Sequence, residues 1–538
     1  MQKKILLLVL ALVGVFALAA CNGETDPGED VPQMRDVSPH YEENANVCYQ
    51  IFPISYADST GDGDGDLTGI TENVDYLSET LNVDCVWLNP FNPSPSYHKY
   101  NVTNYYGIDE TFGTMEDFDN FMETMDNNDI DVVMDFVINH TDFNHVWFER
   151  SRNDEDDYGE WYSWLDQEDY SDWHDRGGWH EHNGRYYYGS FWDQMPELNY
   201  QHEPVREEIY NIAEFWIDKG ITGFRIDAAR HIHDSNQFPR DFDNEQANID
   251  FFKEFNDVVK EINEDVFIVG EIWSNNHTYV GNYLEGMDSV FNFSFADSLK
   301  NAIQNSEHRD VIDDLIDIHN DYSDTREDYI DSVFLTNHDM DRIMSEFNES
   351  EERAKLAARI LLTLPGTSWI YYGEELGMTG EGPDPDRRQP FNWGEDSPYN
   401  PEGSTSTNNH DAISAWDNHN QTLDGVDEQL DDPASLLNAY IDMIDLKQND
   451  ETVRHGELHS ASTDIDEIMA YRRVTEDQDY LVIHNMSRNE MTATLDVSDV
   501  STIYESHEPV IEDDTYTFEP LSTMIIEIET GSSVSITE

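Results

Sequence analysis

Three acidic residues in this sequence each lie at the C-terminal end of a short apolar run or just beyond it. They are Asp227, Glu271 and Asp339, after the apolar runs 221–226, 266–270 and 333–335. Three carboxyl side chains are what glycosidic bond hydrolysis requires: a nucleophile, a proton donor and a further acidic stabiliser. If the runs are strands of a parallel barrel, their C-terminal ends meet at one mouth, where barrel enzymes carry their active sites.

Arg225 lies two residues before Asp227. Alternation along a strand places both side chains on the same face. An arginine beside an aspartate keeps the carboxylate ionised, as a nucleophile requires, although a lone Arg-x-Asp pair would favour a structural ion pair. Glu271 has no basic residue in its own motif, so a raised pKa would suit a role in proton donation.

Eight candidate strands, most of them separated by helical patterns, predict a (β/α)₈ barrel. The strands are expected at 47–53, 83–90, 131–137, 221–227, 266–271, 289–292, 332–336 and 368–372. Helical patterns include 205–219, 249–262, 351–363 and 434–448.

Two further regions depart from this alternation. The segment 141–203 is too long for a loop and rich in Trp, Tyr, His and Asp, so we expect an inserted subdomain. Beyond residue 450 the pattern changes to short alternating runs, which predict an antiparallel β-sandwich. The predicted domains are therefore the barrel over 45–140 and 204–450, the insertion over 141–203 and the sandwich over 451–538.

Four ordered segments resemble the signatures of glycoside hydrolase family 13, the α-amylase superfamily. They are Asp135-Phe-Val-Ile-Asn-His140, Gly223-Phe-Arg-Ile-Asp-Ala-Ala-Arg-His231, Glu271-Ile-Trp273 and Phe334-Leu-Thr-Asn-His-Asp339. Each alone is weak evidence, but four in this order are specific. Met195-Pro-Glu-Leu-Asn199 resembles a further signature, in the form typical of members between oligo-1,6-glucosidases and neopullulanases.

The resemblance implies a role for each acidic residue: Asp227 as nucleophile, Glu271 as general acid/base and Asp339 as transition-state stabiliser. It also implies that the insertion is the family's domain B and the sandwich its domain C. The substrate contacts that it implies are Tyr100, His140, Arg225, Arg230, His231 and His338.

Two positions near these contacts depart from the family or bear on specificity. Lys99, just before Tyr100, replaces a usual glycine, so the backbone shape of that loop is open. Ala228 follows the nucleophile, where members that cut α-1,6 links commonly carry valine. Alanine therefore favours α-1,4 cleavage.

A calcium loop is predicted just after the first strand. Oxygen-bearing side chains stand at alternate positions, as in the first part of an EF-hand loop: Asp58, Thr60, Asp62, Asp64 and Asp66. The twelfth position is Gly69, so another segment would have to complete the shell. A solvated charge run is the alternative, but the spacing and the family precedent favour calcium. We also predict Asn139 as a ligand of the family's other calcium, between the barrel and domain B.

The composition is strongly acidic throughout the chain. Acidic residues outnumber basic ones by 114 to 29, for a formal net charge of −85. Such a surface repels itself at low salt, and molar salt, with a Debye length of about 3 Å, screens the repulsion. The composition therefore predicts a halophilic protein and disfavours nucleic acid as a partner. An aromatic content of 12% argues against general disorder.

The N-terminus predicts export and a lipid anchor. Lys3 and Lys4 precede an apolar run over 5–18, which is too short for a comfortable membrane span. The box that ends at Cys21 resembles a bacterial lipoprotein cleavage site, with an ordinary signal peptide as the alternative. Residues 1–20 would then be the signal peptide and 21–44 a flexible tether, with the mature chain attached to the outer face of a bacterial membrane.

Two cysteines remain, Cys48 and Cys85, in the first and second predicted strands. An exported protein permits a disulfide between adjacent strands. We favour two buried free thiols, because small residues are common in barrel cores and the sequence does not fix the required geometry.

The predicted function is retaining hydrolysis of α-1,4-glucosidic bonds in starch-like α-glucans and maltooligosaccharides by a secreted, salt-adapted α-amylase. The alternative is an exo-acting α-glucosidase or a cyclomaltodextrinase or neopullulanase type of enzyme. A non-catalytic, sugar-binding surface lipoprotein is a third interpretation, which the presence of all three acidic residues disfavours.

Overall fold

A computed structural model describes residues 46–173, 175–394, 414–497, 500–512, 514–532 and 534–537 of the 538-residue chain. The predicted signal peptide and tether, with Cys21, lie outside the described residues. Within the described part of the chain, no helix has the length and apolar character needed to cross a membrane.

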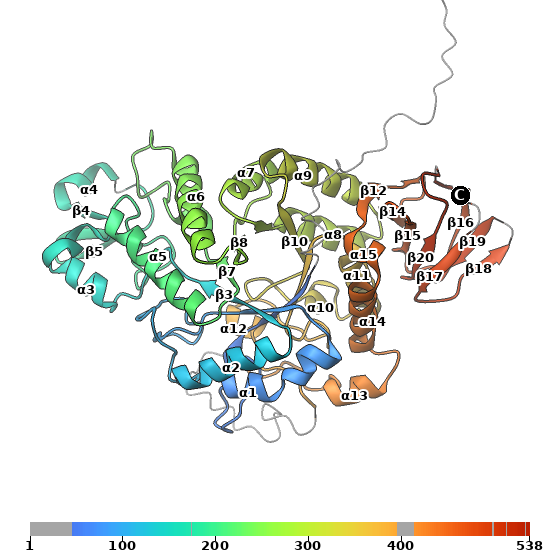
Figure 1. The fold of residues 1–538 in the computed structure, drawn as a ribbon, viewed down its shortest axis with the longest axis horizontal. Helices are drawn as coiled ribbons and strands as arrows, with labels where there is room; N and C mark the ends of the chain where they lie inside the picture. The colour runs from blue at the N-terminus through green and yellow to red at the C-terminus, as the bar shows by residue number, and fades with distance from the viewer. Residues whose placement is uncertain are drawn as a thin grey trace, which may run out of the picture. The chain divides into compact units, whose positions relative to one another are not determined.

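Eight parallel strands close into a barrel, which confirms the predicted fold (Figure 1). Their order around the barrel is β1-β11-β10-β9-β8-β7-β3-β2. The strands are β1 (Val47–Ile51), β2 (Cys85–Leu88), β3 (Asp131–Phe136), β7 (Gly223–Ile226), β8 (Phe267–Gly270), β9 (Ser289–Phe291), β10 (Ile330–Phe334) and β11 (Thr367–Tyr371). Both faces of these strands are covered, which explains why they appear in the sequence as continuous apolar runs.

The helices of the described chain lie between and around these strands. They are α1 (Leu67–Glu72), α2 (Met115–Asn127), α3 (Val146–Arg152), α4 (Gln167–Trp173), α5 (Glu203–Asp218), α6 (Asn244–Ile262), α7 (His277–Gly281), α8 (Phe293–Asn305), α9 (Val311–Thr325), α10 (Ile343–Glu346), α11 (Glu351–Thr363), α12 (Asp384–Arg387), α13 (Val426–Asp431), α14 (Leu436–Asn449) and α15 (Glu451–His455). In α5 the apolar residues Ile209, Ile212 and Trp216 recur at helical spacing and are buried on one face.

The chain leaves the barrel after β3 and returns to it at α5. In between, β4 (Trp164–Asp166), β6 (Arg185–Tyr188) and β5 (Trp179–His182) form a small antiparallel sheet in that order. An isolated bridge between His140 and Glu197 joins the end of this insertion to the end of β3.

The C-terminal domain consists of two five-stranded sheets, ordered β12-β14-β15-β20-β17 and β13-β21-β16-β19-β18. The strands are β12 (Glu457–Ser460), β13 (Ser462–Thr463), β14 (Ile468–Val474), β15 (Asp479–Asn485), β16 (Met491–Leu495), β17 (Ser501–Glu505), β18 (Val510–Glu512), β19 (Thr515–Phe518), β20 (Thr523–Glu527) and β21 (Ser535–Thr537). Leu481 and Ile526 of the first sheet share one apolar core with Leu495 and Phe518 of the second, so the sheets pack as the predicted sandwich. The pairing is antiparallel except between β13 and β21, which run parallel.

The sandwich is tied to the barrel through α11. The hydroxyl of Tyr471 on β14 is hydrogen-bonded to that of Thr363, and Arg473 donates to the Thr363 carbonyl. In Figure 1 the C-terminal strands, in orange to red, gather beside α11 and α14.

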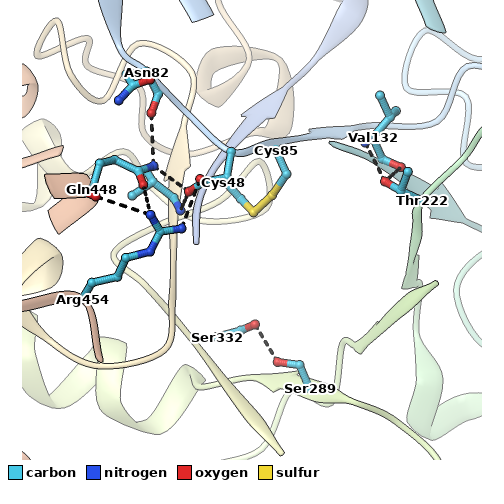
Figure 2. Close-up of a disulfide and its surroundings, with 11 residues drawn as sticks. Cys48, Asn82, Cys85, Val132, Thr222, Ser289, Ser332, Gln448 and Arg454 are labelled. Carbon is cyan, nitrogen blue, oxygen red and sulfur yellow. Dashed lines mark hydrogen bonds and ion pairs between the residues drawn. A yellow bond between two sulfur atoms is a disulfide. The ribbon is translucent and has the colours of Figure 1, made fainter. Parts of the chain in front are cut away.

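The prediction of two free thiols is wrong, because Cys48 and Cys85 form a disulfide (Figure 2). The parallel register of β1 and β2 pairs these residues, with their Cα atoms 4.6 Å apart, a separation that a disulfide spans. Both cysteines line a small cavity with Asp131 and Thr367, which begin their strands. The bridge therefore lies at the N-terminal end of the barrel.

Candidate active site

A cavity of about 480 Å³ opens at the C-terminal ends of the barrel strands. The three predicted catalytic residues all line it: Asp227 follows β7, Glu271 follows β8 and Asp339 lies five residues beyond β10. The complete lining is His98, Tyr100, His140, Phe191, Trp192, Met195, Asp227, Ala228, Arg230, His231, Glu271, Trp273, Asp339, Asp384 and Arg388. The fold thus gathers carboxylates that are up to 112 positions apart in the sequence.

Arg225 lies fully buried behind the cavity and contacts three carboxylates. Its Nη1 is 2.9 Å from Asp227 Oδ1 and 2.7 Å from Asp135 Oδ1, and its Nη2 is 3.0 Å from Glu271 Oε2. Glu271 has no basic residue in its own motif, but the pairing of β7 with β8 brings Arg225 to it from the neighbouring strand. Arg225 holds the carboxylates in place and does not line the cavity.

The pKa of Asp227 also differs from the expectation. Burial raises it well above its usual value, and the Arg225 guanidinium acts in the opposite direction without cancelling the effect. The charges of Glu271 and Asp135 add to the increase. Glu271 Oε2 meanwhile accepts a hydrogen bond from the Ala228 backbone N–H at 3.0 Å. Asp227 and Glu271 thus share one cation.

Asp339 has a different environment. Its Oδ1 is 2.8 Å from Arg388 Nη2, and its Oδ2 is 3.0 Å from His338 Nε2. Burial alone would raise the pKa of Asp339, but His338 and Arg388 outweigh it and hold this pKa well below its usual range. Asp339 therefore stays a carboxylate, as a group that stabilises positive charge must.

Tyr100 and three histidines form the wall between these carboxylates. The Tyr100 ring stacks on the His338 ring with centroids 5.5 Å apart, and both His98 and His140 line the cavity. Burial lowers the pKa of His98 to about 3 and that of His140 to about 4, so both are neutral at pH 7. His338 is fully buried and, like Arg225, lies behind the lining.

The loop after β7 carries the two remaining predicted contacts. Ala228 takes a left-handed conformation, with φ at +48°, and starts a short 3₁₀ turn that presents Arg230 and His231 to the cavity. Arg230 donates to the Trp273 carbonyl at 2.8 Å, and His231 Nδ1 is 2.7 Å from Asp234 Oδ2.

Several lining residues were not predicted from the sequence. Phe191, Trp192 and Met195 come from the insertion, and Asp384 and Arg388 from the segment after β11. Arg388 lies 49 positions from Asp339, and no motif in the sequence linked the two. Phe191, Trp192 and Trp273 are between 46% and 51% exposed, although large aromatic side chains are usually more buried.

Lys99 occupies the position where a glycine was expected and adopts the backbone conformation of one, with φ at +62°. Its side chain is buried, and Nζ is 2.9 Å from Asp109 Oδ1. Left-handed backbone costs a non-glycine residue about 1–2 kcal/mol. The Lys99–Asp109 ion pair connects Asp109 to the loop that presents His98 and Tyr100.

The predicted calcium loop already uses part of its ligand set for backbone hydrogen bonds. Asp58 accepts from the N–H groups of Thr60, Gly61 and Gly63, and Asp66 caps α1 by accepting from Gly69. Across the described ranges, no group of three or more His, Cys, Asp or Glu side chains is arranged to hold a metal ion. Calcium binding through Asp58–Asp66 stays a prediction.

The second predicted calcium ligand has a different setting. Asn139 is buried, and its Oδ1 has no hydrogen-bond partner among the described residues. The same holds for Oε2 of Glu197, whose pKa burial raises to about 8. Two unpartnered oxygens at the junction of barrel and insertion fit the oxygen preference of calcium, but two ligands do not complete a shell.

Comparison with known proteins gives matches over most of the chain. Residues 50–456 match the family described as alpha amylase, catalytic domain, and residues 468–525 match the alpha-amylase SusG C-terminal domain. Alpha-amylase 3 of Dictyoglomus thermophilum is 34% identical over 487 residues, which covers 90% of this chain and 93% of that protein.

Two further relatives are a probable oligo-1,6-glucosidase and a second alpha-amylase. The probable oligo-1,6-glucosidase 2 of Bacillus subtilis is 30% identical over 518 residues, covering 82% of this chain and 90% of its own. The crystal structure of an alpha-amylase from H. orenii superposes with a TM-score of 0.79 at 31% identity, covering 90% of this chain and 99% of that one.

Proposed function

The chain belongs to the α-amylase family of glycoside hydrolases, and on that premise we propose that it hydrolyses α-1,4-glucosidic bonds in starch and maltooligosaccharides with retention of configuration. The observation that carries the proposal is the position of Arg225 between Asp227 and Glu271, behind a cavity that Asp339 also lines. The presence of Asp227, Glu271 and Asp339 in one lining disfavours a non-catalytic sugar-binding protein.

Each carboxyl group has one role in the proposed reaction. The Asp227 carboxylate attacks the anomeric carbon and forms a glycosyl ester, while Glu271 transfers its proton to the departing glycosidic oxygen. Glu271 then takes a proton from water, whose oxygen displaces Asp227 from the anomeric carbon. Asp339, kept ionised by Arg388 and His338, stabilises the positive charge that develops on the sugar.

Arg225 contacts both groups and favours the ionised form of Asp227. Catalysis requires a proton on Glu271 while Asp227 is ionised, and burial, which raises the pKa of Asp227, opposes that ionisation. Substrate bound between the two groups brings the glycosidic oxygen to Glu271, which favours the protonated form there. We therefore expect the acid limb of activity to report the ionisation of Asp227.

Two features support internal cleavage of α-1,4-linked chains. Ala228 lines the cavity and leaves the space beside the nucleophile open. The exposed rings of Phe191, Trp192 and Trp273 lie in the lining near Arg230 and offer apolar faces for further sugars of a longer chain. Sugar rings stack on such faces, so a chain that extends beyond the cleaved bond would gain further contacts there.

The alternative is an exo-acting α-glucosidase or cyclomaltodextrinase type of enzyme. The observation that favours it is the ion pair between Arg388 and Asp384, 3.4 Å long, beside Asp339 in the lining. Paired charged groups of this kind can hydrogen-bond the hydroxyls of a terminal sugar.

A product profile on maltooligosaccharides blocked at the non-reducing end separates the two. Internal cleavage products are expected, whereas release of glucose from unblocked substrates alone would favour the exo-acting alternative. The anomeric form of the first product, read by NMR before mutarotation, should be α; a β product would contradict retention.

The roles of the two carboxyl groups can be separated with α-maltosyl fluoride, whose leaving group needs no protonation. Glu271→Gln should lose starch hydrolysis but still react with the fluoride, and Asp227→Asn should lose both reactions. Equal losses in the two variants on the fluoride would contradict the assignment of Glu271 as the acid.

The proposal extends to export and to a lipid anchor at Cys21, which rest on the sequence of residues 1–21 alone. An anchored enzyme at the cell surface would act on glucans that are too large to enter the cell.

A further inference from the structure

His338 makes a hydrogen bond through each of its ring nitrogens, on opposite sides of the imidazole. Nδ1 lies 2.8 Å from Nε2 of Gln50 on β1. Nε2 lies 2.6 Å from the Tyr100 hydroxyl and 3.0 Å from Asp339 Oδ2. A neutral imidazole carries one proton, so the partners of the two nitrogens decide which atom bears it.

The Tyr100 hydroxyl indicates the direction on the Nε2 side. It lies 2.8 Å from Asp135 Oδ2, and the same carboxylate is paired with Arg225 and accepts a hydrogen bond from the Trp87 indole N–H. A carboxylate surrounded by donors can only accept, so Tyr100 gives its single proton to Asp135. The hydroxyl oxygen must then accept from His338 Nε2, which therefore carries a proton.

The Nδ1 side leads to the same result by a separate path. Nδ2 of Asn89 is 3.2 Å from Asp135 Oδ2, so the amino end of this amide faces the carboxylate and its Oδ1 faces away. That Oδ1 lies 2.9 Å from Gln50 Nε2, and an amide oxygen only accepts. The amino group of Gln50 is therefore the one turned toward His338, and Nδ1 must accept from it.

From these two paths we infer that Gln50 is a positioning residue, which holds His338 as a neutral imidazole with its proton on Nε2, the nitrogen that faces the Tyr100 oxygen and Asp339. Gln50 is buried in β1 and touches neither the cavity nor the carboxylates. Its effect reaches the reaction through the His338 ring that it orients and through Asn89, to which it also donates.

The consequence for the reaction rests on the proposed glycosidase function. With the proton on Nε2, His338 presents an N–H rather than a lone pair to Asp339 Oδ2 and to the Tyr100 oxygen. Arg388 is then the cation that neutralises Asp339, at 2.8 Å. A proton on Nδ1 instead would turn a lone pair toward the Asp339 carboxylate, where two acceptors would face each other.

Among the groups that face His338 from the surrounding elements, the charged ones are Asp339 and Arg388. The full set is Gln50 from β1, the rings of Phe52, Trp87 and Tyr100, the Asp339 carboxylate, and Arg388, whose Nε donates to the His338 carbonyl. His98 also lies close enough to influence the charge balance, and burial keeps it neutral.

The direct test is NMR of the full chain with ¹⁵N-labelled histidine, with the His338 signals assigned by their absence in His338→Asn. The expected result at neutral pH is an unprotonated Nδ1 and a protonated Nε2. Gln50→Glu replaces the donor at Nδ1 with a carboxylate, so this variant should show both nitrogens protonated. A protonated Nδ1 in the wild-type protein would overturn the inference, with no need for activity.

Kinetics supply the second readout. Gln50→Met keeps the side-chain length but removes the donor, and kcat/KM should fall on the order of tenfold, mostly in kcat. Gln50→Glu should also add an ionisation to the pH profile of kcat/KM.

The matched control is Gln429→Met, which removes a buried amide bonded to Leu376 and Asp424 outside the site. Equal kinetics in Gln50→Met and the control would overturn the role of Gln50. A wild-type protein with the expected tautomer but no glucan hydrolysis would instead contradict the proposed function.

Discussion

Arg225 Nη1 lies 2.9 Å from Asp227 Oδ1, and the guanidinium reaches across to Glu271 through its other terminal nitrogen. The nucleophile and the proton donor are therefore not electrostatically separate. One buried cation serves both, together with Asp135, so the cluster carries more negative than positive groups. Charge in excess of its partners is costly in a buried site.

Replacement of Asp227 by asparagine should remove turnover and raise stability at neutral pH. Because burial raises the pKa of Asp227 in the folded state, the wild-type protein loses stability as the pH rises from the unfolded-state pKa of this group toward its folded-state pKa. The variant avoids this loss and should therefore be more stable than the wild-type protein at pH 7. The gain should shrink as the pH falls toward the unfolded-state value of about 4, where both proteins are neutral at this position.

Melting temperatures between pH 4 and pH 8 check this, with Asp241→Asn as the control for the loss of one exposed carboxylate. Asp227 must be ionised to attack the substrate. The acid-side decrease in kcat/KM of the wild-type protein should therefore occur at a higher pH than it would for an aspartate with an ordinary pKa. A variant that is less stable than Asp241→Asn at pH 7 would contradict the assignment of a raised pKa.

The sequence predicted the barrel and the three carboxylates because both depend on local patterns. Runs of apolar residues define the strands, and polar residues at their ends converge in any parallel barrel. The contacts that set the electrostatics of the carboxylates depend on the register between strands, which no local sequence pattern encodes. The Cys48–Cys85 bridge and the Arg225–Glu271 pair both arise between neighbouring strands, and the approach of Arg388 to Asp339 depends on the path of a long loop.

Lys99 should stabilise the fold more than a glycine at the same position would. Lys99→Gly relieves the left-handed backbone but leaves the buried Asp109 without its cation, so a net loss of about 2–4 kcal/mol is expected. Although burial acts to raise the pKa of Asp109, Lys99 and backbone donors lower it overall. The deficit should therefore be present at pH 7 and shrink as the pH falls below about 4.

The double variant Lys99→Gly, Asp109→Asn removes both charges and should recover part of the loss. Denaturant unfolding of the four proteins gives the coupling energy of the pair. Additive losses would show that the ion pair does not offset the backbone conformation. The Michaelis constant should rise in Lys99→Gly, because His98 and Tyr100 flank this residue in the cavity wall.

Cys21→Ala should release the protein from the membrane fraction of cells that express it, with specific activity unchanged. Stable attachment requires at least two acyl chains, which lipoprotein processing at this cysteine would supply. Fractionation followed by an activity assay checks both statements, with Cys48→Ala as a cysteine control that should leave the location unchanged. A Cys21→Ala protein that still sediments with membranes would contradict the anchor.

Salt and calcium should stabilise the fold through different groups. With a formal net charge of −85, the folded chain should gain stability as added salt screens repulsion between carboxylates. Calcium should add to this by binding the folded loop Asp58–Asp66 in preference to the unfolded chain. Asp62 is an exposed member of that loop whose carboxylate accepts only the nearby Asp64 N–H among the hydrogen bonds described, so Asp62→Ala tests the site with little other disturbance.

Melting temperatures across a salt series, with calcium or with chelator, should show a calcium-dependent increase in the wild-type protein that is smaller in Asp62→Ala. Asp241→Ala, which removes an exposed carboxylate outside the loop, controls for charge alone. Equal responses of wild type and Asp62→Ala to chelator would show that the loop is only a charged turn, and a melting temperature that falls with salt would contradict the halophilic interpretation.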